Sequence, residues 1–130
     1  MADSMAKVLI VEDDIASQQY YTVIFDGKYE ISMVSTVQEA KQALKENVFK
    51  VAIIDVSLPG GESGIDLIKD LETEFDDGPI SIVVSAHAFP KIRMEALEAG
   101  AAEFFTKPIL SDVLLDAVEK YVTGSKQVTI

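Results

Sequence analysis

The sequence predicts one doubly wound α/β domain, in which a five-stranded parallel sheet carries helices on both faces. Three observations support this prediction. Five short aliphatic runs alternate along the chain with longer segments of helical periodicity, which is the pattern of repeated βα units. The aliphatic runs are nearly unbroken, as expected for strands that are buried on both faces. The length of 130 residues also fits a single domain of ordinary size.

The five predicted strands are short and rich in β-branched or aromatic residues. In chain order they cover residues 7–11, 29–34, 51–55, 80–85 and 102–106. The second run is the least apolar, so we expect it to be the least buried strand. No internal linker, repeat or low-complexity segment interrupts the series.

Between and after the strands, apolar residues recur at helical spacing and predict faces that cover the sheet. In chain order these stripes are Ala16, Tyr20, Val23 and Ile24; Val37, Ala40 and Leu44; Leu67, Ile68, Leu71 and Phe75; Phe89, Ile92, Ala96 and Leu97; and Val113, Leu114, Ala117, Val118 and Tyr121. We expect the last helix to begin at a capping Ser111 and to end at Gly124. The domain then covers residues 7–123, between an N-terminal extension or expression remnant (1–6) and a C-terminal tail (124–130).

Composition excludes several classes of function. The net charge of −11, from 22 acidic and 11 basic residues, disfavours direct nucleic-acid binding. Cysteine is absent and His87 is the only histidine, so neither a thiolate site nor a histidine-rich zinc site can form. No apolar stretch is long enough to span a membrane and no signal peptide is evident, which favours a cytoplasmic protein without membrane contact.

Acidic residues follow two of the predicted strands at the point where each strand ends. Glu12 and Asp13 come directly after the first run, and Asp55 closes the third. The carboxyl ends of parallel strands meet at one edge of a sheet, so these carboxylates should converge. Their repulsion would favour a hard divalent cation, and magnesium suits such oxygen ligands. The alternative treats this segment as the first turn of a helix, where acidic groups oppose the macrodipole; Asp14 suits that capping role.

Asp55 is also a candidate nucleophile. A carboxylate beside a metal can accept a phosphoryl group as an acyl phosphate, although most aspartates at strand ends only begin a turn. Ser85 and Lys107 end the two following strand regions and could donate a hydrogen bond and a positive charge to phosphoryl oxygens. Taken singly, either is more often an ordinary residue of a strand end. Their position at one predicted edge makes the joint interpretation stronger.

The motifs VLIVEDD (8–14), IIDVSLPG (53–60), VVSA (83–86) and FFTKP (104–108) together resemble the response-regulator receiver domain of two-component phosphorelays. Ser85 lies 30 residues after Asp55, and Lys107 lies 22 residues after Ser85, close to the intervals usual in that family. The resemblance spans nearly the whole chain and implies a (βα)5 flavodoxin-like fold. It implies that Asp55 is the phosphoacceptor, that Lys107 is the phosphoryl partner, and that Mg²⁺ is held by Glu12, Asp13, Asp55 and the backbone carbonyl of Ser57.

The same resemblance implies roles for further residues. Ser85 and Phe104 would form a switch in which the hydroxyl turns toward the phosphoryl group and the aromatic ring changes rotamer. Ser57 and His87 occupy two variable positions that would tune the lifetime of the phosphoryl group. The loop 59–64 has one residue more than is usual in the family, and the Lys107–Pro108 bond is expected to be cis.

The partners implied are a histidine kinase or histidine phosphotransferase and a downstream protein target or covalently linked output domain. The fourth helix, fifth strand and fifth helix would form the output face. Such a domain is a signalling module rather than an enzyme, although it assists its own phosphorylation and dephosphorylation. Alternatives are a phosphorylation-independent interaction domain on the same scaffold, a flavin-binding flavodoxin-like module and a magnesium-dependent aspartyl phosphatase. The flavin-binding module is disfavoured because Glu12, Asp13 and Asp14 follow the first predicted strand in place of a phosphate-binding loop. The phosphatase is disfavoured because Ser57 stands where such phosphatases have a second aspartate.

Overall fold

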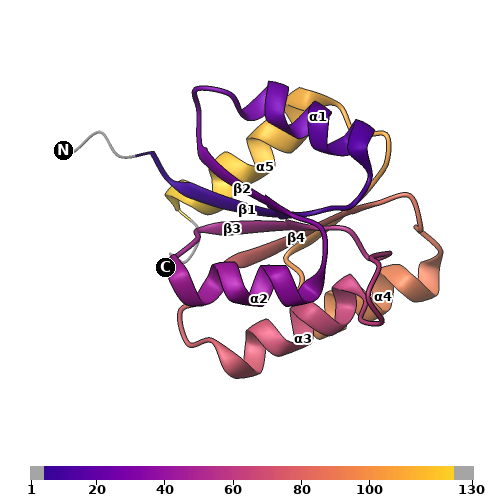
Figure 1. Ribbon diagram of the computed structural model, residues 1–130. Helices are drawn as coiled ribbons and strands as arrows, with labels where there is room; N and C mark the ends of the chain where they lie inside the picture. The colour runs from indigo at the N-terminus through magenta and orange to yellow at the C-terminus, as the bar shows by residue number, and fades with distance from the viewer. Residues whose placement is uncertain (1–4, 125–130) are drawn as a thin grey trace.

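The computed structural model describes residues 5–124 and contains one parallel sheet between two layers of helices (Figure 1). The sheet order is β2-β1-β3-β4-β5, so the chain winds in one direction from β1 and then in the other. The strands are β1 (Lys7–Val11), β2 (Glu30–Val34), β3 (Val51–Ile54), β4 (Ile80–Ser85) and β5 (Glu103–Thr106). The predicted doubly wound fold is confirmed.

Helices cover both faces of the sheet. In Figure 1, α1 (Ile15–Phe25) and α5 (Ser111–Thr123) lie above it. The opposite face carries α2 (Val37–Glu46), α3 (Gly64–Glu74) and α4 (Pro90–Ala99). Alternate strand residues feed the two cores: Leu9 and Ile54 pack with the lower helices, whereas Ile10 and Ile53 pack with α1 and α5.

The register of the sheet brings the strand ends to one level. Val11 of β1 pairs with both Val34 of β2 and Ile54 of β3, so Glu12 and Asp55 leave their strands side by side.

The strand bounds differ slightly from the prediction. β2 begins at Glu30 and β5 at Glu103, each one residue later than expected, and β3 ends at Ile54. As expected, β2, which lies at the edge of the sheet, is the least buried of the five strands.

Side-chain caps fix the beginnings of the first three helices at this same edge. Asp14, Thr36 and Ser63 each accept a hydrogen bond from a backbone N–H of the first turn, so the predicted capping role of Asp14 is confirmed. The predicted cap at Ser111 is wrong. Leu110 has the extended backbone of a cap residue and makes no side-chain cap bond, and Ser111 is already the first helical residue.

Part of the predicted helix faces is also wrong. In α1 the buried residues are Tyr21 and Phe25, whereas Val23 is 74% exposed. This helix is apolar on most sides, so the sequence did not distinguish the face that meets the sheet. Among the other stripes, Phe89, Leu97 and Val113 are exposed. The stripes predicted for α2 and α3 are confirmed.

Residues 1–4 of the predicted N-terminal extension and residues 125–130 of the predicted tail lie outside the described part of the chain. Between residues 5 and 124, none of the helices combines the length and apolar character that crossing a membrane requires.

Candidate phosphoacceptor site

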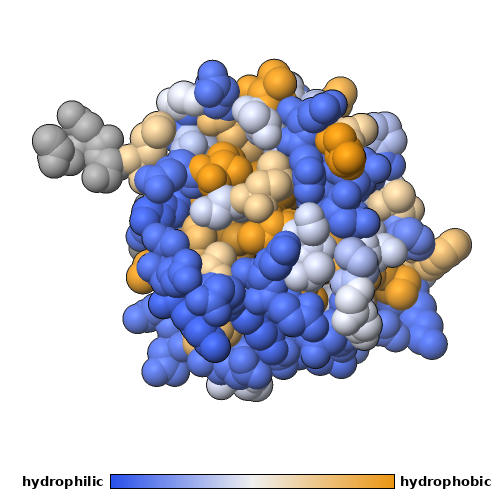
Figure 2. All heavy atoms as spheres, in the orientation of Figure 1, coloured by the Kyte–Doolittle hydropathy of each residue, from blue (hydrophilic) through white to orange (hydrophobic). Residues whose placement is uncertain are grey.

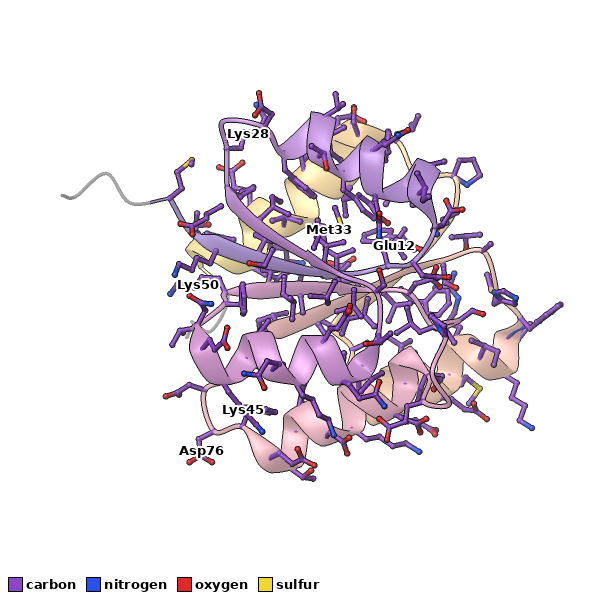
Figure 3. The ribbon with its side chains drawn as sticks, viewed as in Figure 1. Glu12, Lys28, Met33, Lys45, Lys50 and Asp76 are labelled. Carbon is purple, nitrogen blue, oxygen red and sulfur yellow. The ribbon has the colours of Figure 1, made fainter. Side chains whose placement is uncertain are left out.

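Glu12 lies at the carboxyl end of the sheet, opposite the end that carries Lys50 (Figure 3). Its side chain is only 2% exposed. The backbone N–H of Asp14 donates to Glu12 Oε2 at 3.0 Å, and Lys107 Nζ donates to Oε1 at 2.8 Å. Both carboxylate oxygens therefore have partners, as a buried charge requires.

The Asp55 carboxylate is buried and accepts hydrogen bonds from three segments of the chain. Ser85 Oγ donates to Oδ1 at 2.8 Å and the backbone N–H of Ser57 donates to the same oxygen at 3.2 Å. Lys107 Nζ donates to Oδ2 at 3.0 Å. Residues 30 and 52 positions away in the sequence thus contact one carboxylate, which confirms that these strand ends meet.

Lys107 connects the two buried carboxylates. Its Nζ lies within 3.0 Å of oxygens of both Glu12 and Asp55, while its backbone N–H donates to the Ser85 carbonyl at 3.0 Å. The Lys107–Pro108 peptide bond is cis, as expected from the family resemblance. The ammonium lies between the two buried carboxylates of Glu12 and Asp55.

Burial and pairing act in opposite directions on the ionisable groups of this site. Burial raises the pKa of the Glu12 carboxyl above its ordinary value, even though the hydrogen bond from Lys107 opposes this shift. For Lys107, burial alone would lower the pKa, but the hydrogen bonds and charges of Glu12 and Asp55 together raise it. The Lys107 amine is therefore protonated and positively charged at neutral pH.

Asp13 differs from Glu12 and Asp55 because it is exposed. Within residues 5–124, no three carboxylate or imidazole side chains already form a cluster that could hold a metal ion. Glu12 and Asp55 are joined through Lys107, and Asp13 lies at the rim of the same edge, next to Glu12 in the chain. The predicted metal ligands are therefore hard oxygen donors at one edge of the sheet, as Mg²⁺ requires.

The remaining predicted residues lie around this centre. Ser57 is exposed, as is His87, whose backbone N–H donates to Ser85 Oγ at 3.2 Å. Phe104 is buried in the core on the side of α2, α3 and α4. Two glycines of the loop 59–64, Gly60 and Gly61, have positive φ angles of 99° and 94°, which glycine adopts without strain.

Two residues that the sequence did not single out support the site. Gln18 of α1 donates from Nε2 to the Glu12 carbonyl at 2.6 Å. Gly64 begins α3 so close to Asp55 that a Cβ at this position would overlap the backbone carbonyl of Asp55. Gln18 had no distinguishing signal in the sequence. Gly64 was visible only as part of a glycine-containing loop, without indication of which backbone it approaches.

Comparison with known proteins identifies the family. Residues 8–119 match the family described as the response regulator receiver domain. The chain therefore belongs to the receiver domains of two-component response regulators, which are phospho-accepting signalling domains, and this membership does not favour the phosphorylation-independent alternative.

Individual relatives agree with this membership. The chain is 31% identical over 120 residues to the response regulator protein FleR of Pseudomonas aeruginosa, which covers 92% of this chain and 25% of FleR. It is 31% identical over 128 residues to the two-component response regulator PhoP of the same species, covering 95% of this chain and 56% of PhoP. The chain thus spans from a quarter to just over half of the length of these relatives.

A solved structure shows the same fold. The signal receiver domain of a putative LuxO repressor protein from Vibrio parahaemolyticus superposes with a TM-score of 0.85 at 28% identity. The superposition covers 94% of this chain and 93% of that domain.

Proposed function

We propose that Asp55 accepts a phosphoryl group from a phosphorylated histidine of a partner protein. The observation that carries this proposal is the set of donors on one buried carboxylate: Ser85 Oγ, the Ser57 N–H and Lys107 Nζ. The same donors that satisfy the carboxylate are placed to contact the oxygens of a group attached to it. A turn-forming aspartate would not need a lysine and a serine from two other segments of the chain.

In the proposed reaction, a carboxylate oxygen of Asp55 attacks phosphorus as the bond from phosphorus to the donor nitrogen breaks. No protein base is needed because the attacking carboxylate is already ionised, so the chain contributes position and charge. Lys107 can move one donated bond from Asp55 Oδ2 to a phosphoryl oxygen while it keeps its contact with Glu12. Ser85 can donate to a second oxygen in the same way.

We further propose that Glu12, Asp13, Asp55 and the Ser57 carbonyl hold Mg²⁺. The fit rests on the chemistry of the donor set, which consists of hard oxygens on the neighbouring strand ends of β1 and β3. When bound, Mg²⁺ would offset the negative charge of the phosphoryl oxygens. Ser57 and His87, both exposed beside the acceptor, are proposed to set how fast water removes the phosphoryl group.

The proposed donor is a histidine kinase or a histidine phosphotransferase. Several relatives are transcriptional regulators, such as the hydrogenase regulatory protein HoxA of Cupriavidus necator, of which the matched region covers 25%. By analogy, the proposed output is a downstream protein or a linked output domain that responds to the face formed by α4, β5 and α5. The proposed domain bounds remain 7–123, and a cytoplasmic location stays a prediction from the sequence.

Phosphoryl labelling tests the acceptor. The chain is incubated with radiolabelled acetyl phosphate and Mg²⁺, and the acid-stable label on the protein is measured. We expect stoichiometric labelling of the wild type, none in Asp55→Asn, and full labelling in Asp76→Asn, an exposed aspartate at the opposite end of the sheet (Figure 3). Label retained in Asp55→Asn would place the acceptor elsewhere. An unlabelled wild type would instead support the phosphorylation-independent interaction domain.

A further inference from the structure

Phe104 is buried although it lies only three residues before Lys107. Its residue exposure is 6%, and it packs in the core on the side of α2, α3 and α4. A phenylalanine has no hydroxyl group that could hold the ring in place through a hydrogen bond. Contacts other than a hydrogen bond from the ring must therefore keep Phe104 in the buried position.

Arg93 of α4 contacts Phe104 in two ways. Its guanidinium carbon lies 4.9 Å from the centroid of the Phe104 ring, which is within the range of a cation–π interaction. Its Nη1 also donates to the backbone carbonyl of Phe104 at 3.3 Å. One side chain of α4 thus contacts both the ring and the backbone of the same β5 residue.

Arg93 is the only arginine in a chain with 22 acidic residues. Within residues 5–124, its guanidinium takes part in none of the ion pairs, all of which involve lysines. The guanidinium can stack on an aromatic ring and donate a directed hydrogen bond at the same time, whereas a lysine ammonium is a compact point charge. The residue type therefore matches the contact with Phe104 rather than a simple charge requirement.

The position of Phe104 is connected to the acceptor through the sheet. In the register of β4 and β5, Val83 pairs with Phe104 and Ser85 pairs with Thr106. Residues two apart in a strand share a face, so Phe104 and Ser85 are diagonal neighbours on one face of the sheet. Ser85 in turn donates to Asp55 Oδ1 at 2.8 Å. A movement of the ring changes the space beside the Ser85 side chain.

We propose that Arg93 is a positioning residue of the phosphorylation switch. It holds Phe104 in the buried position that accompanies the hydrogen bond from Ser85 to Asp55, and it links α4 to the acceptor. This inference rests on the proposed function of Asp55. Because coupling between two sites is reciprocal, releasing Phe104 from the buried position weakens the binding of a phosphoryl group or its analogue at Asp55.

The first test is fluorine NMR on the full chain labelled with para-fluorophenylalanine, with the Phe104 signal assigned through Phe104→Leu. The variants are Arg93→Gln, Arg93→Lys and the control Lys91→Gln, which removes one positive charge from an exposed position on the same helix. Without ligand, we expect the Phe104 signal to move toward its unfolded position in both Arg93 variants and to stay unchanged in the control. An unmoved signal in Arg93→Gln, or an equal movement in Lys91→Gln, would overturn the proposal.

The second test is a titration with beryllofluoride and Mg²⁺, a stand-in for the phosphoryl group. A cation–π contact at an exposed position corresponds to about a two- to fivefold change in an equilibrium. We expect both Arg93 variants to bind beryllofluoride more weakly by about this factor, and Lys91→Gln to bind as the wild type does. Unchanged affinity in Arg93→Gln would exclude a role in the switch. If the wild type does not bind beryllofluoride, the proposed function of Asp55 fails, while the ligand-free spectra still decide whether Arg93 positions Phe104.

Discussion

Among residues 5–124, two lysines each lie between two carboxylates, and one of the two belongs to the candidate site. Lys107 lies 2.8 Å from Glu12 and 3.0 Å from Asp55. Lys41 of α2 lies 2.6 Å from Asp70 and 3.7 Å from Glu74, both on α3. The difference between the two groups lies in their carboxylates, because the Glu12 and Asp55 side chains are 2% and 8% exposed and those of Asp70 and Glu74 are 30% and 49% exposed. The two lysine side chains are similarly exposed, 20% for Lys107 and 26% for Lys41.

The two groups therefore differ in how much their ion pairs depend on each other's charges. The Lys41 group lies on the side of the molecule where hydrophilic residues cover α2 and α3 (Figure 2), and water screens such pairs. The Glu12 and Asp55 carboxylates are removed from water, so their charges need the ammonium of Lys107. The pKa values agree with this distinction. The hydrogen bond to Asp70 is the main cause that raises the pKa of Lys41, whereas the carboxylates around Lys107 must first overcome its burial.

The largest effect should come from displacing the backbone of Asp55 while every charged side chain of the site is kept. In Gly64→Ala the added Cβ would overlap the Asp55 carbonyl and the Ile54 side chain. We expect the free energy of unfolding to fall by about 3 kcal/mol and the labelling of Asp55 to slow, because the acceptor backbone must move. Urea unfolding and acetyl phosphate labelling measure the two effects.

Gly124→Ala is the matched control for this substitution. Gly124 has a φ of −130° and, among the described residues, no heavy atom near the position of an added Cβ. We expect a change of less than about 0.5 kcal/mol there. Equal effects of the two substitutions would mean that the close approach of Gly64 to Asp55 has no energetic consequence.

The next largest effect should come from removing the cation of the buried group. Lys107→Met leaves Glu12 and Asp55 buried without their shared partner, and we expect a loss of about 2 kcal/mol at pH 7 without Mg²⁺. The pKa of Glu12 is already raised by burial and should rise further. Between its ordinary value of 4.5 and the raised value, the folded state then binds more protons than the unfolded state, so stability falls as the pH rises.

Urea unfolding of Lys107→Met at several pH values measures this dependence. The deficit relative to the wild type should be smaller near pH 5 than near pH 8. Lys50→Met, at the opposite edge of the sheet, removes an exposed lysine and should change stability by less than about 0.5 kcal/mol. A deficit that does not vary with pH would show that Lys107 acts through packing rather than through charge.

The smallest effect should come from the exposed group. Lys41→Met should lower the free energy of unfolding by about 0.5 kcal/mol at pH 7, since its partners Asp70 and Glu74 are partly exposed and water screens the pairs. The pKa of Lys41 is raised above 10.5 by Asp70, so the stabilisation is present below that value and is lost as the pH rises through the raised pKa. Urea unfolding at pH 7 and in the alkaline range should show that the difference in the free energy of unfolding between wild type and variant shrinks as the pH rises. A loss as large as that of Lys107→Met would contradict the distinction between the two groups.

Most of the site could be predicted from the sequence because its residues are tied to strand ends. Glu12, Asp55, Ser85 and Lys107 follow or close aliphatic runs, and parallel strands bring such ends to one edge. The exposed position of Asp13 and the role of Lys107 as a bridge could not be predicted in this way. They depend on side-chain directions, which the strand pattern does not contain.

The helices show the same limit. The faces of α2 and α3 were predicted correctly because one side of each is apolar and the other is polar. The face of α1 was not, because its apolar residues surround the helix and Tyr21 rather than Tyr20 packs inward. Arg93 gave no signal at all, since its partner Phe104 comes from a neighbouring element of the fold.

The order of strands and helices, the doubly wound sheet and the edge at which polar residues gather follow from the amino-acid sequence, because hydrophobic periodicity and chain direction are local properties. Three features depend on the folded packing instead: which lysine lies between buried carboxylates, which face α1 presents to the sheet, and which side chain contacts the Phe104 ring. These depend on burial, and burial is a property of what packs around a residue rather than of the residue itself.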